Sequence, residues 1–166
     1  QKQQNIFASW QSKYPQLKSV ATTCQTDVIN KLRTSESISQ LIGPINNQYG
    51  VRDDILEQIV KMVPESNLQM LQAAIKSAYY DNLAYYSASD MDKLKFARNA
   101  GNAQDCAFFF DHSLHGTQSS SLVKIFDSKN RDNSDREHHV NRVERIVFGW
   151  QVFTSPDKDI CNEGRY

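Results

Sequence analysis

The segment FFFDHSLHG places one acidic residue and two histidines within a short stretch of the chain. His112 and His115 are three residues apart, and on a helix this spacing lets two imidazoles reach one ion. Asp111 would add a carboxylate oxygen to a mixed nitrogen and oxygen site. The other two histidines of the chain are His138 and His139. Asp111, His112 and His115 are therefore weak candidates for metal ligands.

Two observations argue against a metal site. The chain has no HExxH motif. His138 and His139 are adjacent, so on a helix they point about 100° apart and do not readily bind the same ion. An imidazole near the end of a helix is also favoured by the helix dipole, without any metal. We therefore predict neither a bound metal nor any other cofactor.

Cys24, in ATTCQTDVINKL, is a candidate nucleophile, because a cysteine paired with a histidine base can cleave amides or esters. Small peptidoglycan amidases, as a family, place such a cysteine at the start of a helix that packs on a sheet. This chain has no convincing sheet, and Cys24 falls on the apolar face of a predicted helix. We predict no catalytic residue, and a small hydrolase that uses Cys24, or a metal at His112 and His115, is the alternative.

The three cysteines, Cys24, Cys106 and Cys161, form no CxxC motif. Cys161 lies in the polar segment SPDKDICNEGRY, which hydrophobic burial alone would not hold in place. We predict that a disulfide joins Cys161 to Cys106, with Cys24 as the other option and one thiol left over. The competing interpretation is three unpaired cysteines, two of them in the core.

Aromatic residues occupy neighbouring helical positions, as in YYDNLAYY and FFF. Two adjacent aromatics cannot both face the core from one helix, so some rings must lie at its edge or outside. Tyrosine is favoured at protein interfaces. We therefore predict a partner-binding surface that includes Tyr80, Tyr85, Tyr86 and Phe109. Flanking helices or a second subunit would otherwise cover these rings.

A basic stripe follows the last predicted helix. It consists of His138, Arg142 and Arg145, with Glu137 and Glu144 interleaved. Such a pattern is typical of a solvated helix face with local ion pairs. It does not by itself predict nucleic-acid binding.

Apolar residues recur at three- and four-residue steps through most of the chain, which indicates helices. This periodicity predicts helices over residues 3–13, 14–33, 37–47, 51–63, 65–86, 90–100, 104–114 and 134–153. Residues 122–126 (LVKIF) fit either a short strand or a helical turn. We therefore predict an all-α, single-domain helical bundle of seven or eight helices over residues 1–154. A polar C-terminal tail, held by the disulfide, follows over residues 155–166.

Several residues predict where helices begin and end. Ser89 with Asp92 resembles a capping pair, and Ser134 with Glu137 forms an S-x-x-E capping box. NAGNAQ predicts a turn, and Gly116 predicts the end of the helix before it.

Composition limits the partners. The chain has 166 residues, enough for one domain with a substantial core, and 39% of them are hydrophobic. Nineteen basic residues balance nineteen acidic ones. A neutral chain has no overall attraction for nucleic acid or for anionic membranes, so we predict neither partner. No apolar run approaches the roughly 18 residues of a membrane span.

The compartment is predicted from weaker signs. The chain begins at Gln1 without Met and is rich in amide side chains, as expected of a periplasmic or secreted protein after removal of its signal peptide. A trimmed cytoplasmic protein is the alternative. The stretch AIKSAYYDNLAYYSASDMDKLKFARNAGNAQ resembles helical domains of unknown function exported by Gram-negative bacteria, although no site residue is carried over. Small helical, disulfide-bearing periplasmic proteins also include immunity proteins that neutralise secreted effectors.

These observations predict a non-enzymatic, exported, partner-binding protein of the inhibitor or immunity type. Besides the hydrolase, a second alternative is a helical carrier of a hydrophobic ligand, with the aromatics lining a cavity. A homodimer is a further option.

Overall fold

The computed structural model describes residues 9–20, 25–150 and 156–166. Within these ranges the chain is all-α, as predicted, and no strand occurs. The 3₁₀ helices are η1 (Pro15–Ser19) and η2 (Leu114–Gly116). The α-helices are α2 (Gln25–Asn30), α3 (Glu36–Ile42), α4 (Asp53–Met62), α5 (Leu68–Tyr86), α6 (Asp90–Phe110), α7 (Thr117–Asn130), α8 (Ser134–Trp150) and α9 (Lys158–Asn162).

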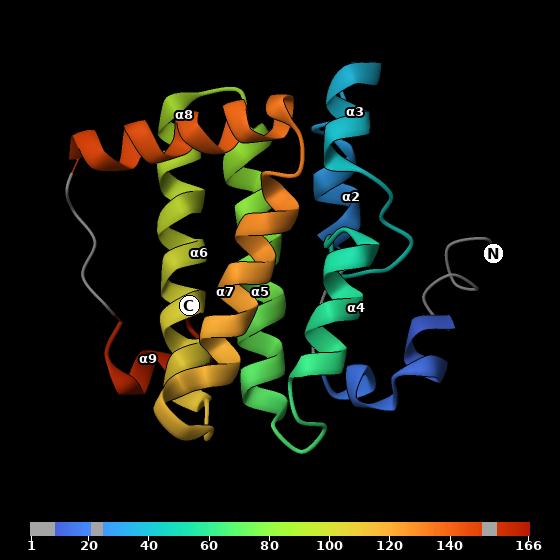
Figure 1. Cartoon of the computed structure of the whole chain (residues 1–166), viewed down its shortest axis with the longest axis vertical. Coiled ribbons are helices and arrows are strands. Elements are labelled where there is room, and N and C mark those ends of the chain that lie inside the picture. The colour runs from blue at the N-terminus through green and yellow to red at the C-terminus, as the bar shows by residue number, and fades with distance from the viewer. Residues whose placement is uncertain (1–8, 21–24, 151–155) are drawn as a thin grey trace.

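The centre of the fold is the antiparallel pair α5 and α6, which are joined by a short turn and packed along their length (Figure 1). Helices α4 and α7 lie beside this pair, and α8 crosses one end of it, over the turn between α5 and α6. This crosswise position of α8 brings its side chains against the last turn of α5 and the first turns of α6. No helix within the described ranges is both long enough and apolar enough to span a bilayer.

The interpretation of residues 122–126 as a short strand is wrong, because this segment lies in the middle of α7. Ser119, Leu122 and Phe126 are buried, and their spacing of three and four residues follows one face of a helix. Packing of this face against the core outweighs the β-propensity of the apolar run.

The turn predicted at NAGNAQ is also wrong, because α6 runs through it without a break. Ala100 and Ala103 are buried there, and the hydroxyl of Ser77 on α5 donates to the carbonyl oxygen of Ala100 at 3.3 Å. Small side chains let α5 and α6 approach closely at this level, and the packing keeps a glycine-containing stretch helical. The helix consequently ends at Phe110, well before Gly116.

The single helix predicted over residues 14–33 is broken in the structure. Its described parts are η1 and α2, and residues 21–24, which include Cys24, lie outside the described ranges. Each part is held by a contact with a distant residue. In α2 the hydroxyl of Thr26 donates to the carbonyl oxygen of Asn47. In η1 the carbonyl oxygen of Leu17 accepts the buried hydroxyl of Tyr49 at 2.8 Å. Val28 in α2 is 41% exposed.

Of the two helix caps predicted from the sequence, that of α6 is confirmed and that of α8 is displaced by one residue. The Ser89 hydroxyl accepts the backbone N–H of Asp92 at 3.1 Å, which confirms that cap. At α8 the cap is one residue earlier than predicted, because the side chain of Asn133, rather than Ser134, accepts the N–H of Arg136 at 2.9 Å.

The C-terminal tail is attached to the bundle. Cys106 on α6 and Cys161 on α9 form a disulfide, which confirms the predicted pairing. The Lys76 ammonium also donates to the carbonyl oxygens of Gly164 and Tyr166, at 3.3 and 3.4 Å, and lies 4.6 Å from the centre of the Tyr166 ring. The tail is therefore held by polar and aromatic contacts as well as by the disulfide.

Candidate anion-binding pocket

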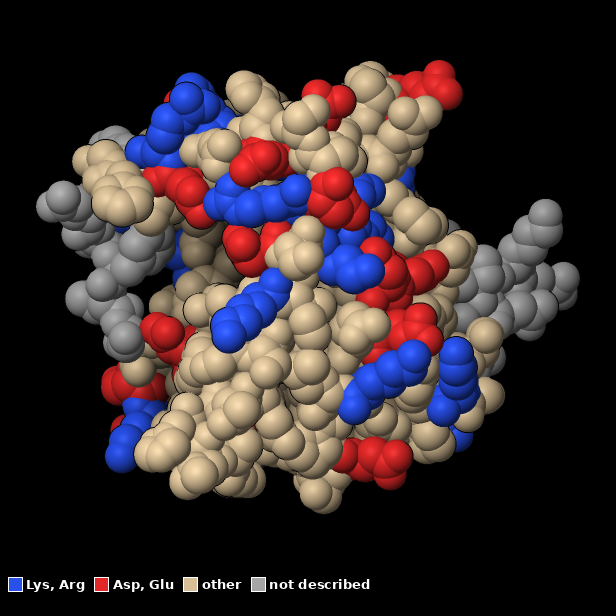
Figure 2. Space-filling model, viewed as in Figure 1, with Lys and Arg blue, Asp and Glu red and all other residues tan. Residues whose placement is uncertain are grey.

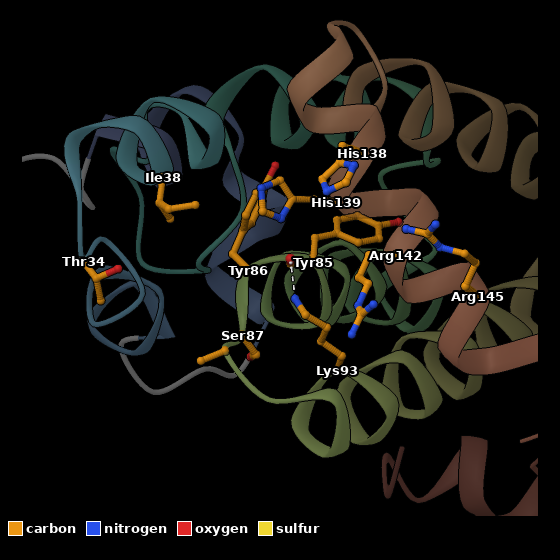
Figure 3. A pocket seen from close by; sticks show the side chains of 11 residues that line it. Thr34, Ile38, Tyr85, Tyr86, Ser87, Lys93, His138, His139, Arg142 and Arg145 are labelled. Carbon is orange, nitrogen blue, oxygen red and sulfur yellow. Dashed lines mark hydrogen bonds between the residues drawn. The ribbon is translucent and has the colours of Figure 1, made fainter. Parts of the chain in front are cut away.

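A hollow of about 470 Å³ lies where α3, the end of α5, the start of α6 and α8 meet (Figure 3). We call it the basic pocket. Its lining residues are Thr34, Ile38, Tyr85, Tyr86, Ser87, Ala88, Lys93, His138, His139, Arg142 and Arg145. Nitrogen-bearing side chains from α6 and α8 thus face two tyrosines from α5 (Figure 3).

Lys93 forms one side of the basic pocket, and its side chain is only 8% exposed. Its ammonium donates to the carbonyl oxygen of Tyr85 at 2.9 Å and to that of Ala84 at 3.4 Å. The last carbonyls of a helix have no partner within it, and the negative end of the helix dipole favours a cation there. An ammonium has three protons to donate, so these two bonds leave one for a ligand.

The imidazole of His139 lies close to the same helix end. Burial lowers the pKa of His139, and the positive charge of Lys93 lowers it further. Its ring lies 5.2 Å from the ring of Tyr86 and 5.9 Å from that of His138. His139 therefore carries little charge at neutral pH.

Two arginines of α8 complete the pocket. Positions 138, 142 and 145 lie three and four residues apart, so they share one flank of the helix. One terminal nitrogen of Arg142 donates to both carboxylate oxygens of Asp90, at 2.9 and 3.0 Å. Arg145 also lines the pocket, and it has no ion-pair partner among the described residues (Figure 3). A guanidinium without a carboxylate partner can bind an incoming one with two hydrogen bonds.

The pocket carries an excess of positive charge. Lys93, Arg142 and Arg145 face it, whereas the carboxylate of Asp90 neutralises only one of them. On the face that Figure 2 shows, charged residues of both signs alternate in a band over α8 and the adjoining end of α7. In that band Arg131 is paired with Asp127 and with Glu144. The basic pocket is thus a local positive site on a neutral protein.

The predicted metal candidates lie elsewhere. Asp111 follows α6, and its carboxylate accepts the backbone N–H groups of Ser113 and Ser119, each at 2.8 Å. These bonds hold the start of α7. His112 and His115 are exposed at this turn, where His115 has a positive φ of 55°. In the part of the chain that the structure describes, no three His, Cys, Asp or Glu side chains are placed to hold a metal ion.

The four predicted partner-binding aromatics do not form one surface. Tyr85 and Tyr86 line the basic pocket. The Tyr80 ring stacks on Phe96, with centroids 6.5 Å apart. Phe109 is 40% exposed near the other end of α6, about 24 Å along the helix from Lys93 at 1.5 Å per residue.

Sequence reasoning identified part of this pocket. The spacing of His138, Arg142 and Arg145 shows that they share a helix face, although that face was expected to be solvated. Lys93 was missed, because nothing near it in the sequence shows that α5 ends beside it. The available signal was the position of this lysine: it follows the Ser89 cap by four residues and comes soon after the long helix α5.

Comparison of the chain with protein-family models, with curated proteins and with solved structures finds no match in any of the three. The geometry of the site is therefore the basis for the function proposed below.

Proposed function

We propose that the protein is a non-enzymatic binding protein that holds an anionic group of a partner protein in the basic pocket. One observation carries this proposal: Lys93, Arg142 and Arg145 line one hollow whose described lining residues include no carboxylate, and only Arg142 is paired, with Asp90 outside the lining. Positive charges held close together repel one another, and an anionic occupant relieves that repulsion. The occupant that fits best is an Asp or Glu side chain, because a carboxylate matches a guanidinium fork.

Several features favour a protein over a free anion as the bearer of this carboxylate. Tyr85 and Tyr86 give the pocket large, rigid walls, and tyrosine and arginine are the residue types that dominate binding energy at protein interfaces. The chain is neutral overall, so attraction is confined to the pocket, and the partner must present its carboxylate there. A loop that projects an acidic side chain would meet this requirement.

The disulfide supports an exported location, because disulfides persist in oxidising compartments such as the periplasm or the extracellular space. A small exported binding protein with one charged recognition pocket fits the inhibitor or immunity type. The partner would then be a secreted enzyme or effector whose acidic loop is covered on binding.

The experiment begins with capture of a partner from secreted and periplasmic fractions of the native source. Affinity is then measured by calorimetry for the wild type, for Arg145→Glu and for the control Lys124→Glu. Lys124 is exposed on α7 and does not line the basic pocket. We expect Arg145→Glu to weaken binding by about tenfold or more, since it replaces attraction by repulsion. Equal affinity of Arg145→Glu and the wild type, or the absence of any retained partner, would refute the proposal.

A further inference from the structure

A second hollow, of about 380 Å³, lies between α5, α6, α7 and α8. Tyr85 lines both hollows, so its ring separates this one from the basic pocket. The two differ in charge: the second hollow is lined by the carboxylates of Asp81, Asp127 and Glu144, and none of its described lining residues is Lys, Arg or His. We call it the acidic hollow.

The three carboxylates are not equivalent. Asp127 and Glu144 are both bound by Arg131, so one guanidinium compensates one of their two negative charges. Asp81 lies on α5 and makes no side-chain hydrogen bond or ion pair with any described residue. Asp81 is partly buried, and a carboxylate that loses water without gaining a partner is unfavourable, so burial raises the pKa of Asp81 to about 7. A cation placed beside Asp81 would remove this penalty.

Apart from Gln104 and the Tyr85 hydroxyl, the other walls of the acidic hollow are apolar. Val143, Val147 and Phe148 of α8 border it, and Phe148 is 78% exposed at its rim. The space is open above Gly101 on α6, where an added Cβ would meet no atom within 4 Å. The volume falls within the range of small-molecule sites, roughly 300–1,000 Å³. An apolar cavity with one convergent charged group is the usual arrangement of such a site.

A bare metal ion does not fit these observations. Calcium and magnesium require several oxygen ligands around one point, and the described carboxylates do not come together in that way. An organic cation needs only one carboxylate for its charge, and it gains the rest of its affinity from apolar and aromatic contact.

We propose that the acidic hollow binds a small organic cation, an ammonium group that carries an apolar substituent. The ammonium lies against the carboxylate of Asp81, and the substituent lies against Val143, Val147 and Phe148. This site is independent of the basic pocket, because it selects the opposite charge and uses the other flank of α8.

The test uses phenethylammonium chloride as the probe, titrated into the full chain at about pH 8, where Asp81 is ionised. Binding is followed by calorimetry and by two-dimensional NMR. The wild type is compared with Asp81→Asn, which removes the charge, and with Gly101→Leu, which fills the open space. The control is Asp135→Asn, an exposed carboxylate on α8 outside the hollow. Neutral 2-phenylethanol serves as the ligand control.

We expect saturable binding to one site on the wild type and on Asp135→Asn. Asp81→Asn and Gly101→Leu should each weaken it by about tenfold or more, and 2-phenylethanol should bind similarly weakly. The proposal is overturned if no saturable binding occurs in the millimolar range, or if Asp81→Asn binds the probe as well as the wild type does. Asp81→Asn removes an unfavourable buried charge, so loss of the fold does not complicate this comparison.

Discussion

The ammonium of Lys93, near the start of α6, lies 2.9 Å from the carbonyl oxygen of Tyr85, near the end of α5. This hydrogen bond joins the start of α6 to the end of α5, and it holds the positive charge of Lys93 beside the basic pocket. Because the ammonium is held by backbone carbonyls, its position depends on the packing of α5 and α6 rather than on a flexible surface rotamer. Lys93 is thus both a buried part of the helix packing and a wall of the basic pocket.

Replacement of Lys93 by Met should destabilise the protein. The change leaves the carbonyl oxygens of Ala84 and Tyr85 without the donor they have now, and buried groups that lose a hydrogen bond cost about 1–3 kcal/mol each. Urea unfolding followed by circular dichroism measures the free energy of unfolding. The matched control is Lys124→Met on the exposed face of α7, which should change it by less than about 0.5 kcal/mol. Equal stability of the two variants would contradict this role for Lys93.

Loss of the Cys106–Cys161 disulfide should also destabilise the fold. The two cysteines are 55 residues apart, and a crosslink over such a distance stabilises a protein by about 2–4 kcal/mol through the entropy of its unfolded chain. We expect the double variant Cys106→Ser and Cys161→Ser to lose about this amount in urea unfolding. Reductant should lower the stability of the wild type but leave that of the double variant unchanged. A wild type insensitive to reductant would show that the disulfide does not contribute.

The Asp81 carboxyl should make stability depend on pH. Burial raises its pKa from 3.8 to about 7. Between these values the folded protein retains a proton that the unfolded chain releases, so stability falls as the pH rises from about 4 to about 7. Asp81→Asn removes this penalty, and because the carboxylate is only partly buried we expect a gain of about 2 kcal/mol at pH 8.

That gain should vanish near pH 4, where Asp81 is protonated in both states. Thermal or urea unfolding at the two pH values measures the difference, and Asp127→Asn is the matched comparison. Because Asp127 is paired with Arg131, its replacement should not stabilise the protein at either pH. A pH-independent effect of Asp81→Asn would contradict the assignment.

Affinity of the basic pocket for a carboxylate should increase as the pH falls. Burial and the charge of Lys93 lower the pKa of His139, and His138 acts in the same direction whereas Asp135 opposes it. A bound carboxylate raises that pKa again, so binding takes up a proton. We expect affinity for an acidic ligand to rise about three- to tenfold between about pH 7.5 and pH 5.5. His139→Gln should flatten this dependence, whereas the exposed His112→Gln should not.

The helices that could be predicted from the sequence are those set by local pattern. Helix α5, the Ser89 cap of α6 and a disulfide at Cys161 follow from spacing or from the polarity of nearby residues, whereas the choice of Cys106 over Cys24 as its partner was left open. The short 3₁₀ helix η1 could not be predicted, because its Leu17 carbonyl oxygen is bound by the hydroxyl of Tyr49, thirty-two residues away. The unbroken course of α6 through NAGNAQ depends likewise on its packing against α5.

The candidate site was harder to predict than the helices. Tyr85 was selected as a surplus aromatic, and the residues of α8 that face it were seen only as a charged stripe. Their convergence depends on α8 crossing the end of the α5–α6 pair, and no local pattern specifies that crossing. Lys93 and Arg142 are far apart in the sequence, yet both line the basic pocket.

The most direct test of the basic pocket needs no natural partner. A capped glutamate, N-acetyl-glutamate N-methylamide, is titrated into the protein at about pH 6, and the NMR signals of the His138 and His139 rings are followed. We predict saturable shifts of both rings in the wild type and in Lys124→Glu, and their loss in Arg145→Glu. Absence of any saturable shift, or equal shifts in Arg145→Glu, would contradict the claim that this pocket binds a carboxylate.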